Sequence, residues 1–328
     1  MSVYYIEEEF YLTHTAGSKP RNDFNTTLRN MNFTSVQEEI QDWRMLNYQN
    51  DIVFIQYTFS YDWKRDFFEF CHQNKVKTVL FINDIASLHD GNYQLIEEEV
   101  NLFNKSAYLI VHNSKMKDWL IQQGVIIPIH CLELFDYLIE TEVYSRIKDR
   151  SYAHEVIFAG NLNPSLRRFL YASDFKHDYQ LNLYGPEVGG ELENDKTTYL
   201  GSFAPEVIPV QLEGSFGLLW NGDSEEGCSG HVGYYSTIAT PHKLSLYLLA
   251  KLPVICWEQA SESDFVVANK LGFTVSSLNE IDEKLSKITL EQYKEMGEHI
   301  QVYSENIQSG FYFKRAIHII LQQLGFNS

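Results

Sequence analysis

The stretch Thr240-Pro241-His242-Lys243 opens the apolar run Leu244-Ser245-Leu246-Tyr247-Leu248-Leu249-Ala250, and Leu252-Pro253-Val254-Ile255-Cys256 follows after a single lysine. The apolar run predicts a buried helix, and the segment after it predicts a buried strand. Thr240 suits the N-cap of this helix and Pro241 its first position, where the missing N–H costs nothing. A helix that leads directly into a buried strand is typical of an α/β fold.

His242 and Lys243 fall in the first turn of this helix, among unpaired backbone N–H groups and at the positive end of the helix dipole. A cation is unfavourable there unless something anionic is bound. The pattern therefore predicts a phosphate held jointly by the helix amides, Lys243 and His242. The alternative is a solvated lysine beside an ordinary helix cap.

The same alternation of strands and helices runs through the whole chain, which predicts parallel sheets covered on both faces. Further strands are predicted at 51–56, 76–82, 107–111, 125–129, 155–159, 180–184 and 215–220, and helices at 63–74, 93–104, 114–123, 261–270 and 281–288. The polar segment 140–151 separates two such series. We therefore expect one domain over 1–150, to which the apolar helix within 311–328 returns, and a second domain over 151–310. Ligands of such sheets bind at the carboxyl ends of the strands.

The composition is that of a soluble globular protein, with 44% hydrophobic residues among 328. A net charge of −18 argues against a nucleic-acid binder, because phosphate backbones need a basic surface. The four cysteines form no CxxC pair, which fits a reducing cytosol. Neither a secretion signal nor an apolar run of about 20 residues is visible, so we expect a cytoplasmic protein with peripheral membrane contact at most.

Three nucleotide-binding motifs are absent from the sequence: GxGxxG after the first strand, Walker A, and the DxD triplet that holds Mg²⁺ or Mn²⁺ against a diphosphate. If a nucleoside diphosphate binds, backbone amides and basic side chains must neutralise it. We therefore expect no metal ion and no other cofactor.

Two segments of the second half could contact such a ligand. Gly160 and Asn161 end a strand, and the nearby pair Arg167-Arg168 could clamp a diphosphate. The alternative is a tight turn with two surface arginines. The loop 220–230 is rich in glycine and long for a simple connection, which is typical of a loop that shapes a site. Its acidic residues could bind sugar hydroxyls or could be solvated.

In the first half, Asp84 follows a predicted strand and could deprotonate an acceptor hydroxyl, although an N-cap or turn aspartate is the alternative. His14 is a second candidate for this base. Gly17, Ser18 and Lys19 suit an anionic or sugar acceptor. His112 is expected to be a structural residue at the end of a strand.

Several of these segments together resemble the bacterial β-1,6-galactofuranosyltransferases, and the resemblance spans nearly the whole chain. A more distant similarity is to the glucosyltransferases that extend N-acetylglucosamine on serine-rich adhesins. The resemblance rests on Ala16-Gly17-Ser18-Lys19, Phe81-Ile82-Asn83-Asp84, Phe158-Ala159-Gly160-Asn161-Leu162, Trp220-Asn221-Gly222-Asp223-Ser224, Cys228-Ser229-Gly230 and the 241–248 block. Both families imply a GT-B architecture, in which two Rossmann-like domains face each other across a cleft. The nucleotide-sugar donor binds the C-terminal domain and the acceptor binds the N-terminal domain.

The resemblance also assigns roles to residues. It implies that Lys243 contacts the donor diphosphate and that Arg168, paired with Phe169, does so too. A family tyrosine near the base corresponds to Phe203, which keeps only the ring. The donor site is expected to comprise Gly160, Asn161, Arg168, Tyr184, Phe203, Asp223, Ser229, His242 and Lys243.

The function that the resemblance implies is metal-independent, inverting transfer of a hexose from a UDP-sugar to a glycan hydroxyl. Galactofuranose is the leading sugar, and the acceptor is expected to be a cell-surface polysaccharide precursor on a lipid carrier. We further expect a homo-oligomer. The alternatives are a glucosyl or N-acetylglucosaminyl transferase acting on a serine-rich adhesin, a non-catalytic UDP-sugar-binding partner of the same fold, and an epimerase.

Overall fold

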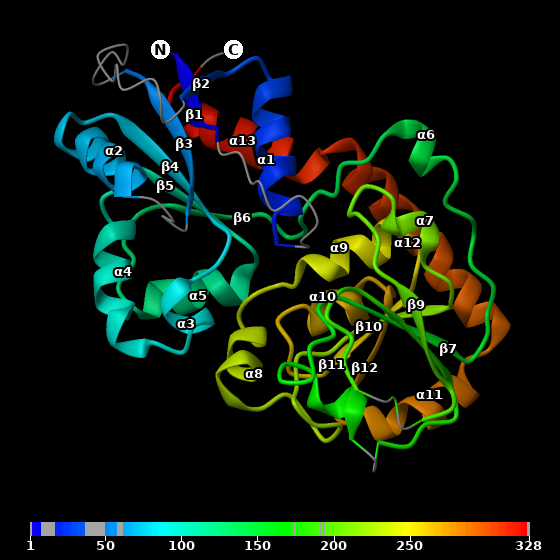
Figure 1. The fold of residues 1–328 in the computed structure, drawn as a ribbon. Coiled ribbons are helices and arrows are strands. Elements are labelled where there is room, and N and C mark those ends of the chain that lie inside the picture. The colour runs from blue at the N-terminus through cyan, green and yellow to red at the C-terminus, as the bar shows by residue number, and fades with distance from the viewer. Residues whose placement is uncertain are drawn as a thin grey trace. The chain divides into compact units, whose positions relative to one another are not determined.

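The structure is a computed structural model that describes residues 2–7, 17–36, 50–57, 62–172, 175–190, 192 and 194–326. They form two units (Figure 1). Unit 1 combines Gly17–Asp136 with the N-terminal strand and the segment that begins at Gly310, and unit 2 extends from Tyr137 to Ser309.

The boundary lies after Asp136, whereas the polar segment 140–151 suggested residue 150. Hydrogen bonds explain the difference, because the segment after Asp136 is already bonded to unit 2. The Tyr137 hydroxyl donates to the carbonyl of Pro205 (2.8 Å), and the Arg150 guanidinium donates to the carbonyls of Ala250 (2.8 Å) and Leu212 (2.6 Å).

Unit 1 is built on a six-stranded parallel sheet in the order β2-β1-β3-β4-β5-β6. The strands are β1 Val3–Ile6, β2 Thr34–Val36, β3 Ile52–Tyr57, β4 Lys77–Ile82, β5 Tyr108–Val111 and β6 Ile129–Cys131. The helices are α1 Lys19–Asn30, α2 Asp62–Gln73, α3 Ala86–His89, η2 Tyr93–Leu95, α4 Ile96–Phe103, α5 Ser114–Gln122 and α13 Phe311–Gln323.

The last helix of the chain, α13, completes unit 1 (Figure 1). The buried carboxylate of Asp136 accepts the backbone N–H groups of Tyr312 (3.1 Å) and Phe313 (2.6 Å), at the first turn of this helix. Burial raises the pKa of Asp136 to about 8 despite these bonds. The Phe313 ring packs edge-on against Phe24 and Phe81, with centroids 5.2 and 5.6 Å away.

Unit 2 contains a second parallel sheet, in the order β12-β11-β10-β7-β8-β9. The strands are β7 Glu155–Ala159, β8 Gln180–Tyr184, β9 Thr197–Gly201, β10 Phe216–Leu219, β11 Val254–Trp257 and β12 Gly272–Val275. The helices are α6 Thr141–Tyr144, η3 Arg168–Tyr171, α7 Ile208–Gln211, α8 Gly230–Ser236, α9 His242–Leu249, α10 Ser263–Ala268, η4 Leu278–Glu280, α11 Ile281–Lys287 and α12 Leu290–Ser309. This is the strand order of a Rossmann-type sheet, whose winding reverses between β7 and β10.

The predicted parallel α/β architecture is confirmed in both units, and details of the helix starts differ. Helix α9 begins at His242 and not at Pro241, whose ψ of 137° makes it an extended cap residue, so the predicted N-cap at Thr240 is wrong. The helix predicted over 261–270 begins only at Ser263, as α10, and Glu262 occupies its cap position. Ser277 does cap the next helical segment, since its hydroxyl accepts the N–H of Asn279 at 3.2 Å.

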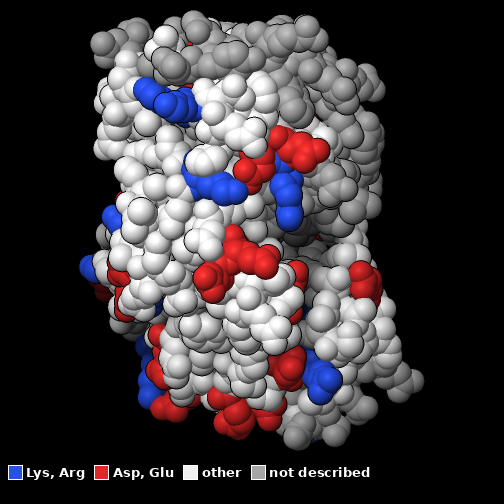
Figure 2. Space-filling model, turned by 90° about the vertical axis from the view of Figure 1, so that its left-hand side faces the viewer, with Lys and Arg blue, Asp and Glu red and all other residues white. Residues whose placement is uncertain are grey.

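In Figure 2, acidic and basic side chains are intermixed on the visible face, and its described residues form no continuous basic surface. Within the described ranges, no helix is both long and apolar enough to cross a bilayer.

Candidate active site

The candidate site of unit 2 lies where the sheet reverses its winding, between β7 and β10. These strands pair only through Phe216 with Val156 and Gly217 with Ile157. Beyond those two pairs the ladder stops, although both strands continue to Ala159 and Leu219. In doubly wound sheets, the crevice at the carboxyl ends of such strands is the usual ligand site.

The side chain of Lys243, in the first turn of α9, ends in this region. Its Nζ lies 4.4 Å from the centroid of the Phe158 ring, at the end of β7. A Cβ atom on Gly160 would stand 2.7 Å from both Nζ and Cε of Lys243, so the end of the lysine side chain lies directly against the glycine backbone. The residue as a whole is half-buried, but Nζ is shielded from solvent and has no hydrogen-bond partner among the described residues.

This environment is unfavourable for an ammonium group. Burial, followed by the nearby Arg167 guanidinium, holds the pKa of Lys243 well below its ordinary value. A buried ionisable group without a partner is costly, and such groups concentrate at functional sites. An anion at the N-terminus of α9 would supply the missing partner and would lie at the positive end of the helix dipole. The geometry is therefore suited to an anion.

Arg167 is the second cation of this site. Its pKa is lowered by burial, which the Asp223 carboxylate partly opposes, and its Nε is buried without a partner among the described residues. Its guanidinium lies 5.9 Å from the centroid of the Phe158 ring, and Lys243 contacts the same ring. Arg168, which the resemblance favoured, is instead exposed as the first residue of η3. Of the two adjacent arginines, Arg167 is thus the one that lies near Lys243.

We expect Arg167→Ala to weaken UDP binding by about tenfold or more, the scale of one lost charge-assisted hydrogen bond. Arg168→Ala, the matched control, should leave the dissociation constant within about twofold, because its exposed side chain is solvated. Isothermal titration of UDP into both variants checks this. Equal losses in the two variants would contradict the assignment.

His242 lies beside Lys243, and its ring stacks on that of Tyr137 with centroids 5.0 Å apart and planes 11° from parallel. The imidazole is therefore held in place by packing within unit 2.

Gly160 and Asn161 form a tight turn at the carboxyl edge of the sheet. Asn161 donates to the Glu187 carboxylate (3.0 Å), and its amide oxygen accepts the N–H of Asn163 (2.8 Å). Gly160 donates its N–H to the carbonyl of Tyr184 (2.8 Å). Asn161 therefore shapes the turn that carries Gly160.

The loop 220–230 is ordered by its own backbone contacts. The Trp220 indole donates to the Ser224 carbonyl (2.9 Å), and a Cβ on Gly222 would stand 2.4 Å from the Gly227 carbonyl oxygen. Asp223 and Ser229 remain exposed, and Asp223 is close enough to raise the pKa of Arg167 against the effect of burial. This loop thus places a carboxylate beside one of the two cations.

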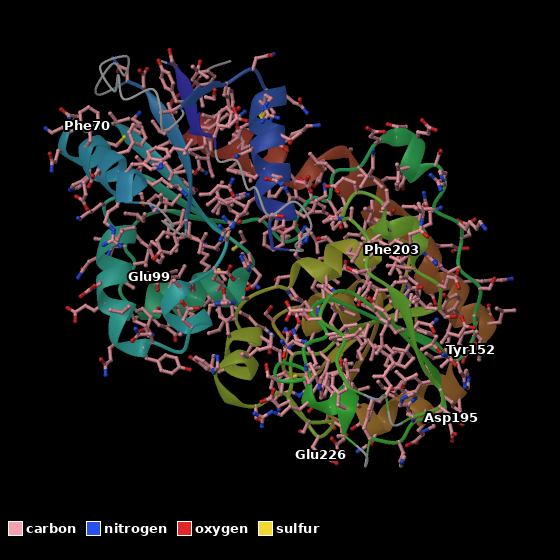
Figure 3. The ribbon with its side chains drawn as sticks, in the orientation of Figure 1. Phe70, Glu99, Tyr152, Asp195, Phe203 and Glu226 are labelled. Carbon is pink, nitrogen blue, oxygen red and sulfur yellow. The ribbon has the colours of Figure 1, made fainter. Side chains whose placement is uncertain are left out.

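The side chain of Tyr184, which the resemblance placed in the donor site, is buried inside unit 2. Only 1% of its surface is exposed, and its hydroxyl accepts the N–H of Glu213 (2.8 Å). Burial raises the pKa of Tyr184 to about 12. The half-buried Phe203, labelled in Figure 3, has its ring centroid 6.2 Å from that of Tyr184. Of the two rings, Phe203 is the one that a ligand can reach.

In unit 1, Asp84 follows β4 and is half-buried. Next to it, His112 is buried, and its Nε2 donates to the Asn83 carbonyl at 2.9 Å. Burial lowers the pKa of His112, and the Asp84 charge opposes that shift. His112 thus has the structural environment that its strand-end position predicted, and it lies beside the proposed base.

Glu99 is a buried carboxylate that sequence reasoning missed (Figure 3). It accepts the N–H groups of Ala86 (2.8 Å) and Ser87 (3.2 Å), and so caps α3 just after Asp84. The sequence around α3 could not reveal this cap, because Glu99 belongs to another helix, α4.

Of the three residues predicted to bind the acceptor, Lys19 is already paired with a neighbouring carboxylate. Its ammonium forms a buried ion pair with Asp23 at 2.6 Å, so its charge is neutralised within α1. Ser18 is buried and Gly17 exposed. His14 lies outside the described residues.

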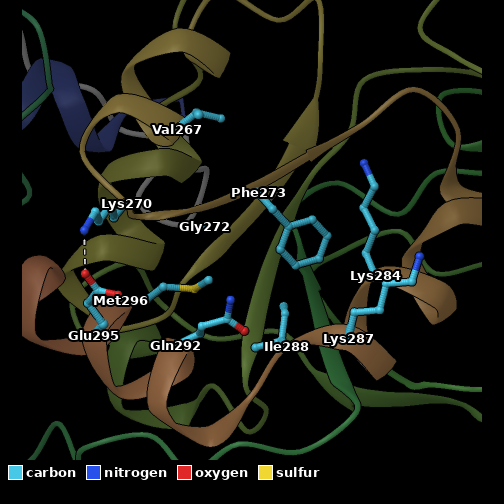
Figure 4. Close-up of a pocket in the computed structure, with 10 residues that line it drawn as sticks. All are labelled: Val267, Lys270, Gly272, Phe273, Lys284, Lys287, Ile288, Gln292, Glu295 and Met296. Carbon is cyan, nitrogen blue, oxygen red and sulfur yellow. Dashed lines mark hydrogen bonds and ion pairs between the residues drawn. The ribbon is translucent and has the colours of Figure 1, made fainter.

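A separate pocket of about 320 Å³ lies against β12, with Phe273, Ile288 and Met296 in its lining (Figure 4). Its lysines are already paired: Lys270 with Glu295, Lys284 with Glu280, and Lys287 with Glu283. It therefore offers no unpaired cation to an anionic ligand. Across the described residues, no group of three His, Cys, Asp or Glu side chains gathers in a metal-binding arrangement.

Comparison with known proteins gives matches over both units. The family described as "Glucosyltransferase 3-like, N-terminal domain" matches residues 4–134, and its C-terminal counterpart matches residues 156–320. The β-1,6-galactofuranosyltransferase WbbI of Escherichia coli K12 is 36% identical over 76% of this chain and 73% of its own. Glucosyltransferase 3 of Streptococcus gordonii is 26% identical over 74% and 70%.

Solved structures share the fold at low sequence identity. HepE of Anabaena, in complex with UDP-glucose, superimposes with a TM-score of 0.59 at 13% identity, and 99% of each chain is covered. WaaG, a glycosyltransferase of lipopolysaccharide biosynthesis, gives a TM-score of 0.53 at 11% identity over 97% of this chain and 99% of its own. The predicted resemblance and the GT-B fold are thereby confirmed. With both of its domains matched, the chain belongs to the glucosyltransferase 3-like family and is a glycosyltransferase.

Proposed function

We propose that this glycosyltransferase moves a hexose from a UDP-sugar to a hydroxyl of a glycan, without a bound metal ion. The observation that carries the proposal is the buried amino group of Lys243, which has no partner among the described residues and lies at the N-terminus of α9, where the sheet reverses its winding. A diphosphate is the anion that this position would favour.

In the proposed reaction, the bond between the anomeric carbon and the diphosphate breaks as the acceptor oxygen forms the new glycosidic bond. Lys243, Arg167 and the amides of α9 place fixed positive charge where the leaving diphosphate gains negative charge. Asp84 takes the proton of the acceptor hydroxyl as general base, with inversion at the anomeric carbon. His14 is the alternative base.

The proposed donor is UDP-galactofuranose, on the strength of the 36% identity to the Escherichia coli galactofuranosyltransferase. The proposed acceptor is a polysaccharide precursor at the cytoplasmic face of the membrane. A glucose donor is the second candidate, because both domains match the glucosyltransferase 3-like family.

The test offers a panel of UDP-sugars with simple glycosides, with and without EDTA, and identifies products by mass spectrometry. Galactofuranose transfer that survives EDTA is the expected result. Glucose transfer would promote the second candidate, and loss of activity in EDTA would overturn the metal-free mechanism. No UDP release with any acceptor would favour a non-catalytic partner, and UDP-sugar interconversion without an acceptor would indicate an epimerase.

The depressed pKa of Lys243 predicts that UDP binding takes up a proton. A bound diphosphate favours the charged lysine and so raises its pKa, which means that the complex holds more protons than the free protein. Above pH 7, where the terminal phosphate is fully ionised, UDP affinity should therefore fall as pH rises, by up to about tenfold per unit. Titration in buffers of different ionisation enthalpy measures the uptake. The same uptake in Lys243→Met would contradict this origin.

A further inference from the structure

A second residue of α9, Tyr247, lies one helical turn after Lys243 and therefore on the same side of the helix. Its side chain is fully buried, with 0% of the residue exposed. We propose that the Tyr247 hydroxyl holds β7 and β10 apart where the sheet reverses its winding, and thereby positions the Lys243 ammonium for the donor diphosphate. This inference rests on the proposed function and adds a positioning residue to it.

The Tyr247 hydroxyl forms hydrogen bonds to β7 and β10 at the point where direct pairing of these two strands has stopped. It accepts the N–H of Ala159 at 2.8 Å, and it lies 3.3 Å from the carbonyl oxygen of Leu218 and 3.5 Å from that of Ile157. Regular pairing of the strands ends at Gly217 with Ile157. The hydroxyl thus stands between the two strands immediately beyond the last pair, and it satisfies backbone groups that direct pairing would otherwise use.

The ring of Tyr247 also packs very closely against the backbone of the sheet. A Cβ atom on Gly217 would stand 2.3 Å from Cγ of the ring, so the ring lies directly against the β10 backbone. Ala159, whose N–H the hydroxyl accepts, immediately precedes Gly160, which Lys243 contacts. Two contacts on one helix face therefore fix α9 against the end of β7: the hydroxyl at Ala159 and the ammonium at Gly160.

The alternative is that Tyr247 is an ordinary buried tyrosine that contributes only stability. Tyr293 provides the matched control, because it is also buried in unit 2 and its hydroxyl donates to the Ser215 carbonyl at 2.8 Å. That bond lies just before the start of β10, away from the strand end that carries the site. Tyr247→Phe and Tyr293→Phe therefore each remove one buried hydroxyl bonded to the sheet backbone, at opposite ends of β10.

The experiment titrates UDP and uridine separately into the full-length variants. The ratio of the two affinities isolates the contribution of the diphosphate. Tyr247→Phe should lower this ratio by about tenfold and leave uridine affinity within about twofold, because Lys243 is no longer held in place. Tyr293→Phe should lower the melting temperature and leave the ratio unchanged. An unchanged ratio in Tyr247→Phe would overturn the inference.

A double-mutant cycle gives a second readout. In a Lys243→Met background, Tyr247→Phe should have no further effect on the ratio, because the hydroxyl acts through the lysine. A further loss of similar size would show that Tyr247 acts independently, which would also overturn the inference. Wild-type protein that binds neither UDP nor a UDP-sugar would instead refute the proposed function itself.

Discussion

Lys243→Met is expected to lower turnover by at least about tenfold, the scale of one lost charge-assisted contact, and also to raise the melting temperature of the ligand-free protein. Turnover falls because no ammonium remains to stabilise the departing diphosphate. Stability rises because methionine fills a similar volume without the cost of burying an ionisable group that has no partner among the described residues. A single side chain thus favours function and opposes folding.

The pH dependence of that stability gain follows from the direction of the pKa shift. The pKa of Lys243 is lower in the folded state than in the unfolded state, so the unfolded chain binds more protons and the wild type becomes more stable as pH rises. The advantage of Lys243→Met should therefore be largest at low pH and shrink toward the ordinary lysine pKa. Thermal denaturation across pH measures it.

Lys251→Met is the control for this experiment. Lys251 follows the other end of α9 and pairs with the exposed Asp149 at 2.7 Å. Its replacement should leave turnover unchanged. It should also leave the pH dependence of stability unchanged above about pH 6, where Asp149, whose pKa Lys251 lowers, is ionised with or without this pair. A wild-type level of turnover in Lys243→Met at saturating donor would refute the proposed role of Lys243.

Gly185→Ala should destabilise the protein by about 3 kcal/mol or more. A Cβ atom at this position would stand 1.8 Å from the carbonyl oxygen of Gly160, and the backbone there cannot rotate away as a side chain could. Gly185 also has a φ of 139°, which L residues rarely adopt. Urea denaturation measures the loss.

Gly297→Ala is the opposite control for the glycine prediction. Gly297 lies within α12, and a Cβ atom added there would meet nothing within 4 Å. Alanine should therefore stabilise the helix by about 0.5 to 1 kcal/mol. Comparable destabilisation by both substitutions would indicate that the clash with Gly160 is not the cause.

The fold was largely readable from the alternation of apolar runs with amphipathic stretches. The predicted strands 155–159 and 180–184 coincide with β7 and β8, because inner strands of a parallel sheet are apolar on both faces. The edge strands β9 and β12 escaped prediction, since their residues are mostly half-buried or exposed and carry no continuous apolar run.

The candidate site could be predicted only where one local pattern defined it. The helix start at 241–243 indicated Lys243, but no local pattern says which of two adjacent arginines faces the sheet. In the structure Arg167 is half-buried just before η3, whereas Arg168, the first residue of η3, is exposed. The pairing of Lys19 with Asp23 was also missed, although the i,i+4 spacing was a signal that could have found it. The contact of Tyr247 with Ala159 joins segments far apart in the chain, so it needed the structure.

The position of α13 has a consequence for how the chain is made. Among the described residues, unit 2 is one continuous segment, whereas unit 1 combines early strands with α13, which is synthesised after unit 2. On the ribosome, unit 2, which carries Lys243, can therefore reach its native form before α13 completes unit 1. Until Tyr312 and Phe313 emerge, the Asp136 carboxylate lacks the two amides that hold it in the finished protein. The two units can thus be completed in the reverse of the order in which they begin: unit 1 starts first and is completed last.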